Sequence, residues 1–222
     1  MSDPSIPEPL PRALAAPVRT ESVVRKSRFI ADLAPVADAE GSDTVLAEIR
    51  REFHDARHHC TAMVFGLDRS EQRSNDDGEP AGTAGAPMLA VLRASGLTDV
   101  IAVVTRYFGG TLLGAGGLVR AYSESVSTAL AQAQLLDRRR VTLFTAAAEH
   151  ADAGRLEHLL RTWSGPAGAN VGTGRYTADG AEFELTVPTT QVEDLHASLA
   201  ASGIAHRLQP LGEDVQAVPT SS

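Results

Sequence analysis

The sequence predicts an α+β protein of two domains, the second with a ferredoxin-like order of elements. Three observations support this prediction. Apolar patterns typical of strands and helices run from about residue 20 to residue 134. The stretch LLDRRR at 135–140 then interrupts the pattern. After it, six segments follow in the order βαββαβ within about 70 residues, which is the ferredoxin-like plan.

The first domain is expected over residues 20–137. Apolar residues on both sides of the polar turn RKSR predict short strands, and Ser42 is expected to cap the next helix. Two apolar runs then predict buried strands, and a long polar segment between them predicts a loop. In order, we expect strands at 23–24 and 29–33, a helix with an apolar face from Val45 to Phe53, a strand at 60–67, a loop at 69–85, a helix at 88–95, a strand at 99–107 and a helix at 116–134.

The second domain is expected over residues 138–211. Its elements are a strand at 141–150, a helix carrying Leu156, Leu159, Leu160 and Trp163, a hairpin around 178–180, a helix carrying Val192, Leu195 and Leu199, and a short strand at 204–208. Prolines prevent regular structure, so residues 1–19 are predicted to be a disordered tail. Residues 212–222 are predicted to be a loose tail.

The composition limits the classes of function. The chain of 222 residues has a net charge of −8, which argues against a generally basic nucleic-acid-binding surface but allows a local patch. Cys60 is the only cysteine, so no internal disulfide can form, which fits a reducing compartment. No apolar run is long enough to span a membrane and the start does not resemble a signal peptide, so we expect a cytoplasmic protein.

A glycine-rich loop between a predicted strand and a predicted helix is the first candidate site. It contains Gly109, Gly110, Gly114, Gly116 and Gly117, with Arg106 before it and Arg120 after it. Glycines let backbone N–H groups approach a ligand, and a helix N-terminus favours an anion. Neither nucleotide-binding fingerprint is present. The alternative is that these glycines serve tight turns and packing, while the arginines pair internally.

An acidic loop is the second candidate, because Asp76, Asp77 and Glu79 lie within four residues. Three carboxylates can hold Mg²⁺ or Ca²⁺, but the spacing lacks further ligands, so we expect a polar surface site rather than a metal cage. The same carboxylates are the natural internal partners of Arg106 and Arg120. We expect no metal and no cofactor.

The sequence HHC, His58 to Cys60, places a thiol beside two imidazoles. Alternation along a strand points His59 and Cys60 to opposite faces, and no third orienting group is identifiable. A cysteine among apolar residues is more often a small core residue than a nucleophile. We therefore retain His58, His59 and Cys60 only as secondary candidates, with no catalytic set assigned.

Four stretches together resemble the Impact family, in its bacterial YigZ branch. They are KSRFIA (26–31), DARHHCTA (55–62), DDGEPAGTAG (76–85) and RYFGGTLLGAGGLVRAY (106–122), and the resemblance is strong over about residues 20–135. It implies a first domain with the fold of ribosomal protein S5 domain 2, followed by the ferredoxin-like domain. Asn75 and Thr105 are small departures from the family pattern. The family motifs map onto Lys26, Arg28, His58, Asp76, Asp77, Glu79, Arg106, Gly109, Gly110, Gly114, Gly116, Gly117 and Arg120.

The resemblance implies a role in translation, because eukaryotic relatives act in translational control through an additional domain. The leading interpretation is a non-enzymatic binding protein that contacts the ribosome, RNA or a translation factor through Lys26, Arg28, Arg106, Arg120 and the glycine loop. Arg138, Arg139 and Arg140 offer a second basic patch. The alternative is a metal-assisted or phosphate-handling hydrolase that uses the acidic loop beside the glycine loop.

Overall fold

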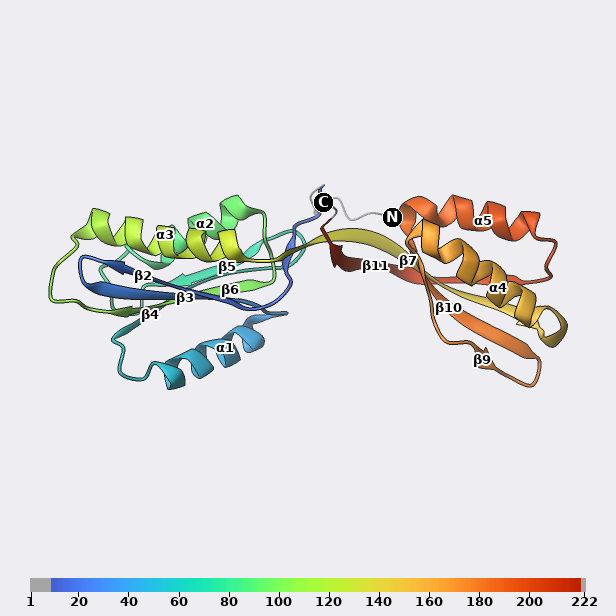
Figure 1. Ribbon diagram of the computed structural model, residues 1–222, viewed down its shortest axis with the longest axis horizontal. Coiled ribbons are helices and arrows are strands. Elements are labelled where there is room, and N and C mark those ends of the chain that lie inside the picture. The colour runs from blue at the N-terminus through green and yellow to red at the C-terminus, as the bar shows by residue number, and fades with distance from the viewer. Residues whose placement is uncertain (1–8, 221–222) are drawn as a thin grey trace. The chain divides into compact units, whose positions relative to one another are not determined.

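The computed structural model describes residues 9–220, which divide into two compact units (Figure 1). The N-terminal domain runs to Arg138 and includes the segment from Ala217 onward, and the C-terminal domain spans Arg139–Gln216. Each domain combines helices with a mainly antiparallel sheet, so the predicted α+β class is confirmed. No helix in the described part of the chain is both long and apolar enough to cross a membrane.

The N-terminal domain is built on a five-stranded sheet with the strand order β2-β3-β6-β4-β5 and antiparallel neighbours throughout. Its strands are β2 (Val18–Val24), β3 (Ser27–Pro35), β4 (His58–Phe65), β5 (Glu71–Asn75) and β6 (Val100–Tyr107). Helices α2 (Gly85–Ser95) and α3 (Ala115–Gln132) cover one face, and α1 (Ala39–Glu52) covers the other (Figure 1).

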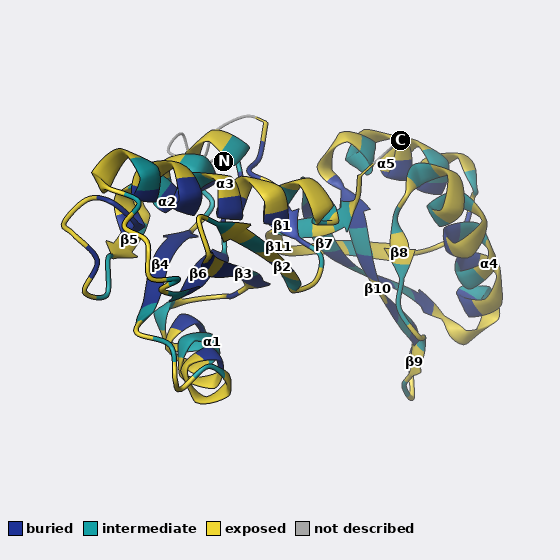
Figure 2. Cartoon of the chain, turned by 60° about the vertical axis from the view of Figure 1, so that its left-hand side comes forward, coloured by how far each residue is buried: buried dark blue, intermediate teal, exposed yellow. Residues whose placement is uncertain are grey.

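Alternation along the strands gives the N-terminal domain a core on each face of its sheet (Figure 2). Phe29 and Val104 pack beneath α2 and α3, whereas Ile101 and Val103 pack against α1. β6 is buried along nearly its whole length, as expected for the central strand of a sheet covered on both faces.

Two local predictions in this domain are wrong. The N-cap of α1 is Asp38, whose Oδ1 accepts a hydrogen bond of 2.8 Å from the N–H of Gly41. Ser42 is instead buried within the first turn, where its hydroxyl donates to the backbone oxygen of Asp38. The predicted loop at 69–85 also contains β5, a polar strand at the edge of the sheet that pairs with β4.

The prediction that both ends of the chain lack regular structure is also wrong for the residues that the structure describes. Ala13–Leu14 forms the short strand β1, which pairs with Leu135 and Leu136, and Leu14 is only 3% exposed. At the other end, β11 (Arg207–Pro219) continues through most of the segment expected to be loose. Residues 1–8 and 221–222 of the predicted tails lie outside the described residues.

The C-terminal domain has the βαββαβ order that the sequence predicts. Strand β7 is paired on one side with β11 and on the other with β10, which in turn pairs with β8. Both helices pack on one face of the sheet, over a core that includes Phe144, Leu156 and Phe183. The elements are β7 (Leu135–Glu149), α4 (His150–Ala167), β8 (Asn170–Val171), β9 (Arg175–Tyr176), β10 (Gly180–Pro188), the 3-10 turn Thr189–Gln191, α5 (Val192–Ala201) and β11.

Strand β7 is longer than the sequence predicts. LLDRRR does not interrupt the structure, because β7 begins at Leu135 and continues through Arg138, Arg139 and Arg140. The predicted second strand of this domain is split into β8 and β9. Both domain boundaries therefore fall within strands, one in β7 and one in β11.

Candidate functional site

A buried ion pair joins the end of β6 to the acidic loop. Nη1 of Arg106 donates to Oε1 of Glu79 across 2.6 Å, and the two side chains are only 6% and 4% exposed. The same guanidinium donates from Nη2 to the hydroxyl of Ser27 and lies between the rings of Phe29 and Phe108. Arg106, expected to bind an anion, is thus enclosed by the protein and already paired with one.

Tyr122 of α3 completes this network. Its hydroxyl donates to the same oxygen of Glu79 across 2.7 Å, so the carboxylate links the acidic loop to both the sheet and the helix. The Sγ atom of Cys60 lies 3.3 Å from that hydroxyl and 3.0 Å from the backbone oxygen of Asp76. Burial raises the pKa of Cys60 to about 12 and also raises the pKa of Tyr122. Both groups are therefore neutral, and Cys60 is a core residue.

The two histidines face opposite sides of β4 and do not act together. Nδ1 of His58 donates to the backbone oxygen of Asp77 across 2.9 Å, while Nε2 lies 4.0 Å from Glu79. His59 faces α1, where its Nε2 contacts the backbone oxygen of Phe53 and burial lowers its pKa. The structure therefore does not assemble a nucleophile and base from the HHC sequence.

The remaining carboxylates of the acidic loop also have structural partners. Asp76 accepts hydrogen bonds from the N–H groups of Gly82, Ala84 and Gly85, and so caps the start of α2 from the loop that precedes it. Asp77 accepts from Arg50 and from the N–H of His59. The expectation of an open polar site on this loop is wrong for Glu79, which is buried. Within residues 9–220 no group of three or more acidic, histidine or cysteine side chains is placed to hold a metal.

The glycines of the loop have different roles. Gly109 lies directly against the β2–β3 turn, where an added Cβ would come within 2.0 Å of the backbone oxygen of Lys26. Gly110 and Gly114 have φ values of 81° and 73°, which favour glycine. A Cβ on Gly117 would touch Leu113, whereas one on Gly116 would meet nothing within 4 Å. The alternative interpretation, tight turns and packing, therefore accounts for most of these glycines.

The turn between β2 and β3 presents two cations that remain free to bind. Arg25 and Lys26 form a two-residue turn with positive φ values of 45° and 68°, a geometry that usually selects Asn or Gly. Both side chains are exposed, and neither has a hydrogen bond or ion pair with another described residue. Arg25 was not among the site residues predicted from the sequence, although the adjacent basic pair in RKSR indicates it. Arg28, by contrast, pairs with Glu21 and lies over the ring of Tyr107.

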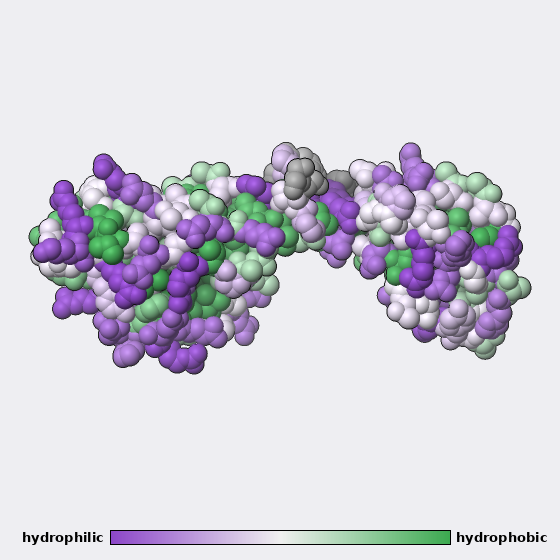
Figure 3. Space-filling view, viewed as in Figure 1, coloured by the Kyte–Doolittle hydropathy of each residue, from purple (hydrophilic) through white to green (hydrophobic). Residues whose placement is uncertain are grey.

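Arg120 and three apolar residues lie at the same end of the domain. Arg120 is exposed on the second turn of α3, with no hydrogen bond or ion pair to the described part of the chain. Leu112 is 82% exposed, Phe108 48% and Val119 38%. Figure 1 shows the β2–β3 turn beside the loop that leads into α3, and Figure 3 shows apolar and hydrophilic residues alternating over this end. We call Arg25, Lys26, Phe108, Leu112 and Arg120 the glycine-loop surface.

Comparisons with known proteins agree with this architecture. A family model described as the Impact N-terminal domain matches residues 25–130. The IMPACT family member YigZ of Escherichia coli is 47% identical over 148 residues, which are 66% of this chain and 72% of YigZ. The IMPACT family member YvyE of Bacillus subtilis is 44% identical over 141 residues, 64% of this chain. The chain spans 65% of the length of YvyE, just under two thirds.

A solved structure extends the similarity across both domains. The crystal structure of a hypothetical protein is 37% identical to this chain, with a TM-score of 0.61. The match covers 90% of this chain and 96% of that protein. The motif stretches identified in the sequence lie together in the N-terminal domain, within the region that the family model matches. The chain therefore belongs to the IMPACT family.

Proposed function

We propose that this protein is a non-enzymatic binding protein linked to translation, and that its glycine-loop surface contacts RNA phosphates on the ribosome. The observation that carries the proposal is the set of unpaired, exposed cations Arg25, Lys26 and Arg120 around a loop whose Gly109 packs against the β2–β3 turn. These three cations on a chain of net charge −8 are suited to a local anionic partner.

Backbone geometry supports the same surface. Non-glycine residues with positive φ are uncommon and concentrate at functional sites, and here two occur in succession at the tip of a hairpin. The backbone of Lys26 packs against Gly109, so the turn and the loop support one another. A preorganised surface loses less conformational entropy when it binds.

The link to translation rests on the IMPACT family, since the resemblance to this family implies a role in translational control. Translation also implies a cytoplasmic location for this chain. The alternative of a hydrolase at the acidic loop has less support, because Asp76, Asp77 and Glu79 each already bind protein donors. A carboxylate that caps a helix or neutralises a buried arginine is not free to activate water.

Co-sedimentation with purified bacterial ribosomes tests the proposal. We expect the wild-type protein to pellet with ribosomes at low salt, and the double variant K26A/R120A to pellet much less. The control is R155A/R161A on α4, which removes two exposed arginines that are paired with carboxylates. Absence of wild-type binding, or equal loss in the control, would contradict the proposal.

A further inference from the structure

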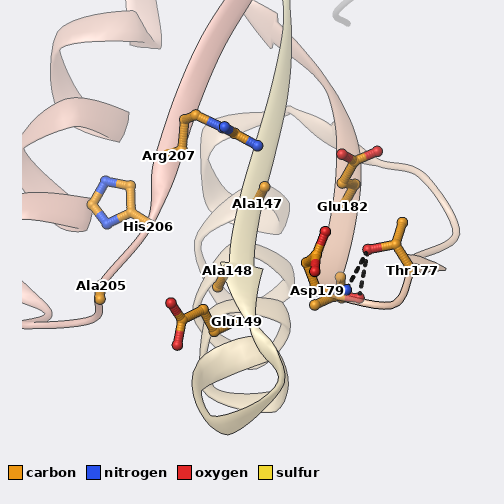
Figure 4. A pocket seen from close by; sticks show the side chains of 11 residues that line it. Ala147, Ala148, Glu149, Thr177, Asp179, Glu182, Ala205, His206 and Arg207 are labelled. Atoms are coloured by element: carbon orange, nitrogen blue, oxygen red, sulfur yellow. Dashed lines mark hydrogen bonds between the residues drawn. The ribbon is translucent and has the colours of Figure 1, made fainter.

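A pocket in the C-terminal domain is separate from the proposed translation site and is not explained by it. It has a volume of about 410 Å³ and lies where β7 ends and where β10 and β11 begin (Figure 4). Pockets that bind small molecules occupy about 300–1,000 Å³, so this one is large enough for a small metabolite. All of its lining residues belong to the C-terminal domain.

Small residues create the hollow. Ala147 and Ala205 add only small side chains to its lining, whereas Ala148 and Ala181 turn their methyl groups into the core on the other face of the sheet. Gly180 presses its backbone against β7, since an added Cβ would lie 2.0 Å from the backbone oxygen of Ala148. The turn beside it is fixed by His150, whose Nε2 lies 3.1 Å from the backbone oxygen of Ala178. The wall that Gly180 and this turn form is thus held in place by backbone contacts.

Opposite charges line the pocket without neutralising one another. Figure 4 shows the Arg207 side chain reaching across β7 above Ala147. Asp179 lies on the opposite side of β7, and Glu149 lies at the end of β7. None of these three side chains forms a hydrogen bond or ion pair with any other residue in the range 9–220. Glu182 differs, because it already pairs with Arg175. The pocket therefore offers one free cation and two free carboxylates.

We infer that this pocket binds a small zwitterion of the α-amino acid class. Such a ligand carries a carboxylate, for which Arg207 provides a planar donor, and an ammonium group, for which Glu149 and Asp179 provide acceptors. The small side chains of Ala147 and Ala205 leave room for the remaining aliphatic part of the ligand. An anion alone would meet two carboxylates, and a cation alone would meet Arg207, so only a ligand with both charges complements the whole lining.

Titration calorimetry of the full chain with the twenty common α-amino acids tests this inference. We expect at least one to bind with a dissociation constant below about 1 mM, the upper end of usual small-metabolite affinities. Its decarboxylated amine and its deaminated acid, such as isobutylamine and isovalerate for valine, are expected to bind at least about tenfold more weakly, because each lacks one charged contact.

Variants then assign the contacts. We expect Arg207→Ala and Asp179→Ala each to weaken binding about tenfold, while Arg155→Ala, an exposed arginine of α4 outside the pocket, has no effect. NMR shifts of the Ala147 and Gly180 amides in the wild-type protein locate the ligand without relying on any variant. The inference is overturned if no amino acid binds below about 1 mM, or if the amine binds as tightly as the amino acid and Arg207→Ala changes nothing.

Discussion

Arg106 and Glu79 form a buried ion pair of 2.6 Å that fastens the acidic loop to the central strand of the N-terminal sheet. The sequence is compatible with two roles for Arg106: binding an external anion or pairing with a carboxylate of the same chain. In the structure Arg106 pairs with Glu79. Tyr122 donates to the same carboxylate oxygen, which extends the connection to α3. Strand β6, helix α3 and the acidic loop thus meet at one carboxylate.

Removing Glu79 is expected to destabilise the N-terminal domain strongly. Glu79→Ala leaves the Arg106 guanidinium buried without its counter-charge, a change that typically costs about 3–5 kcal/mol of unfolding free energy. Urea denaturation followed by circular dichroism measures this loss. The matched control is Glu71→Ala, which removes the partner of Arg73 from an exposed ion pair and is expected to cost less than about 1 kcal/mol. Equal effects of the two substitutions would contradict the structural role of Glu79.

Gly109 and Gly116 are expected to respond oppositely to the same substitution. Gly109→Ala forces a Cβ to within 2.0 Å of the Lys26 backbone, so the turn or the loop must move and stability must fall. Gly116→Ala places its Cβ in open space within α3 and is expected to stabilise by about 0.5–1 kcal/mol. Thermal unfolding of the two variants measures both effects. A stable Gly109→Ala variant with an unchanged β2–β3 turn would refute the packing role.

The sequence predicts the larger elements of this fold because their apolar periodicity is strong. β6 and the helix face around Ile49 follow from β-branched runs and from helical spacing. β5 was missed because EQRSN is polar throughout, as an exposed edge strand can be. The cap at Asp38 was missed because Ser42 has the same capping chemistry four residues later.

The site was harder to predict, because sequence patterns do not show which charges are buried. Arg106 and Arg120 flank the same glycines in the sequence, yet one is enclosed by Phe29 and Phe108 and the other is exposed. Burial of Arg106 depends on the register that places it opposite Phe29, which only the assembled sheet defines. The pocket in the C-terminal domain likewise depends on strand ends that are distant in the sequence.

Asp76 is expected to make stability depend on pH. Burial alone would raise the pKa of its carboxyl group, but the three backbone N–H donors outweigh burial and lower it. A group with a lowered folded-state pKa stabilises the fold above its unfolded pKa of about 3.9 and loses this effect as the pH falls further. Asp76→Ala should therefore cost about 0.5–2 kcal/mol near neutral pH, with a smaller difference below about pH 4.

Denaturation of wild type and Asp76→Ala across this pH range checks the prediction. Glu48→Ala, on the exposed surface of α1, is the control and should show little difference at any pH. A cost for Asp76→Ala that stays constant during acidification would show that the carboxylate charge is not what stabilises the start of α2.

Cys60 is expected to be unreactive in the folded protein. Its side chain is fully buried and its pKa is raised to about 12, so very little thiolate exists even at about pH 8. Because it is the only cysteine, its reaction with a disulfide reagent such as DTNB reports on a single site. We expect modification only at the rate of unfolding, accelerated by urea. Rapid modification of the folded protein would contradict its place in the core.

The central claim is that the exposed cations of the glycine-loop surface bind the ribosome, whereas Arg106 supports the fold. Ribosome affinity as a function of salt, together with unfolding free energy, tests this claim on wild type, K26A/R120A and E79A. We predict that K26A/R120A retains stability, binds ribosomes more weakly and lowers the log–log salt slope by about one unit per lost phosphate contact. E79A should lose stability. Unchanged affinity and salt slope in a stable K26A/R120A protein would contradict the claim.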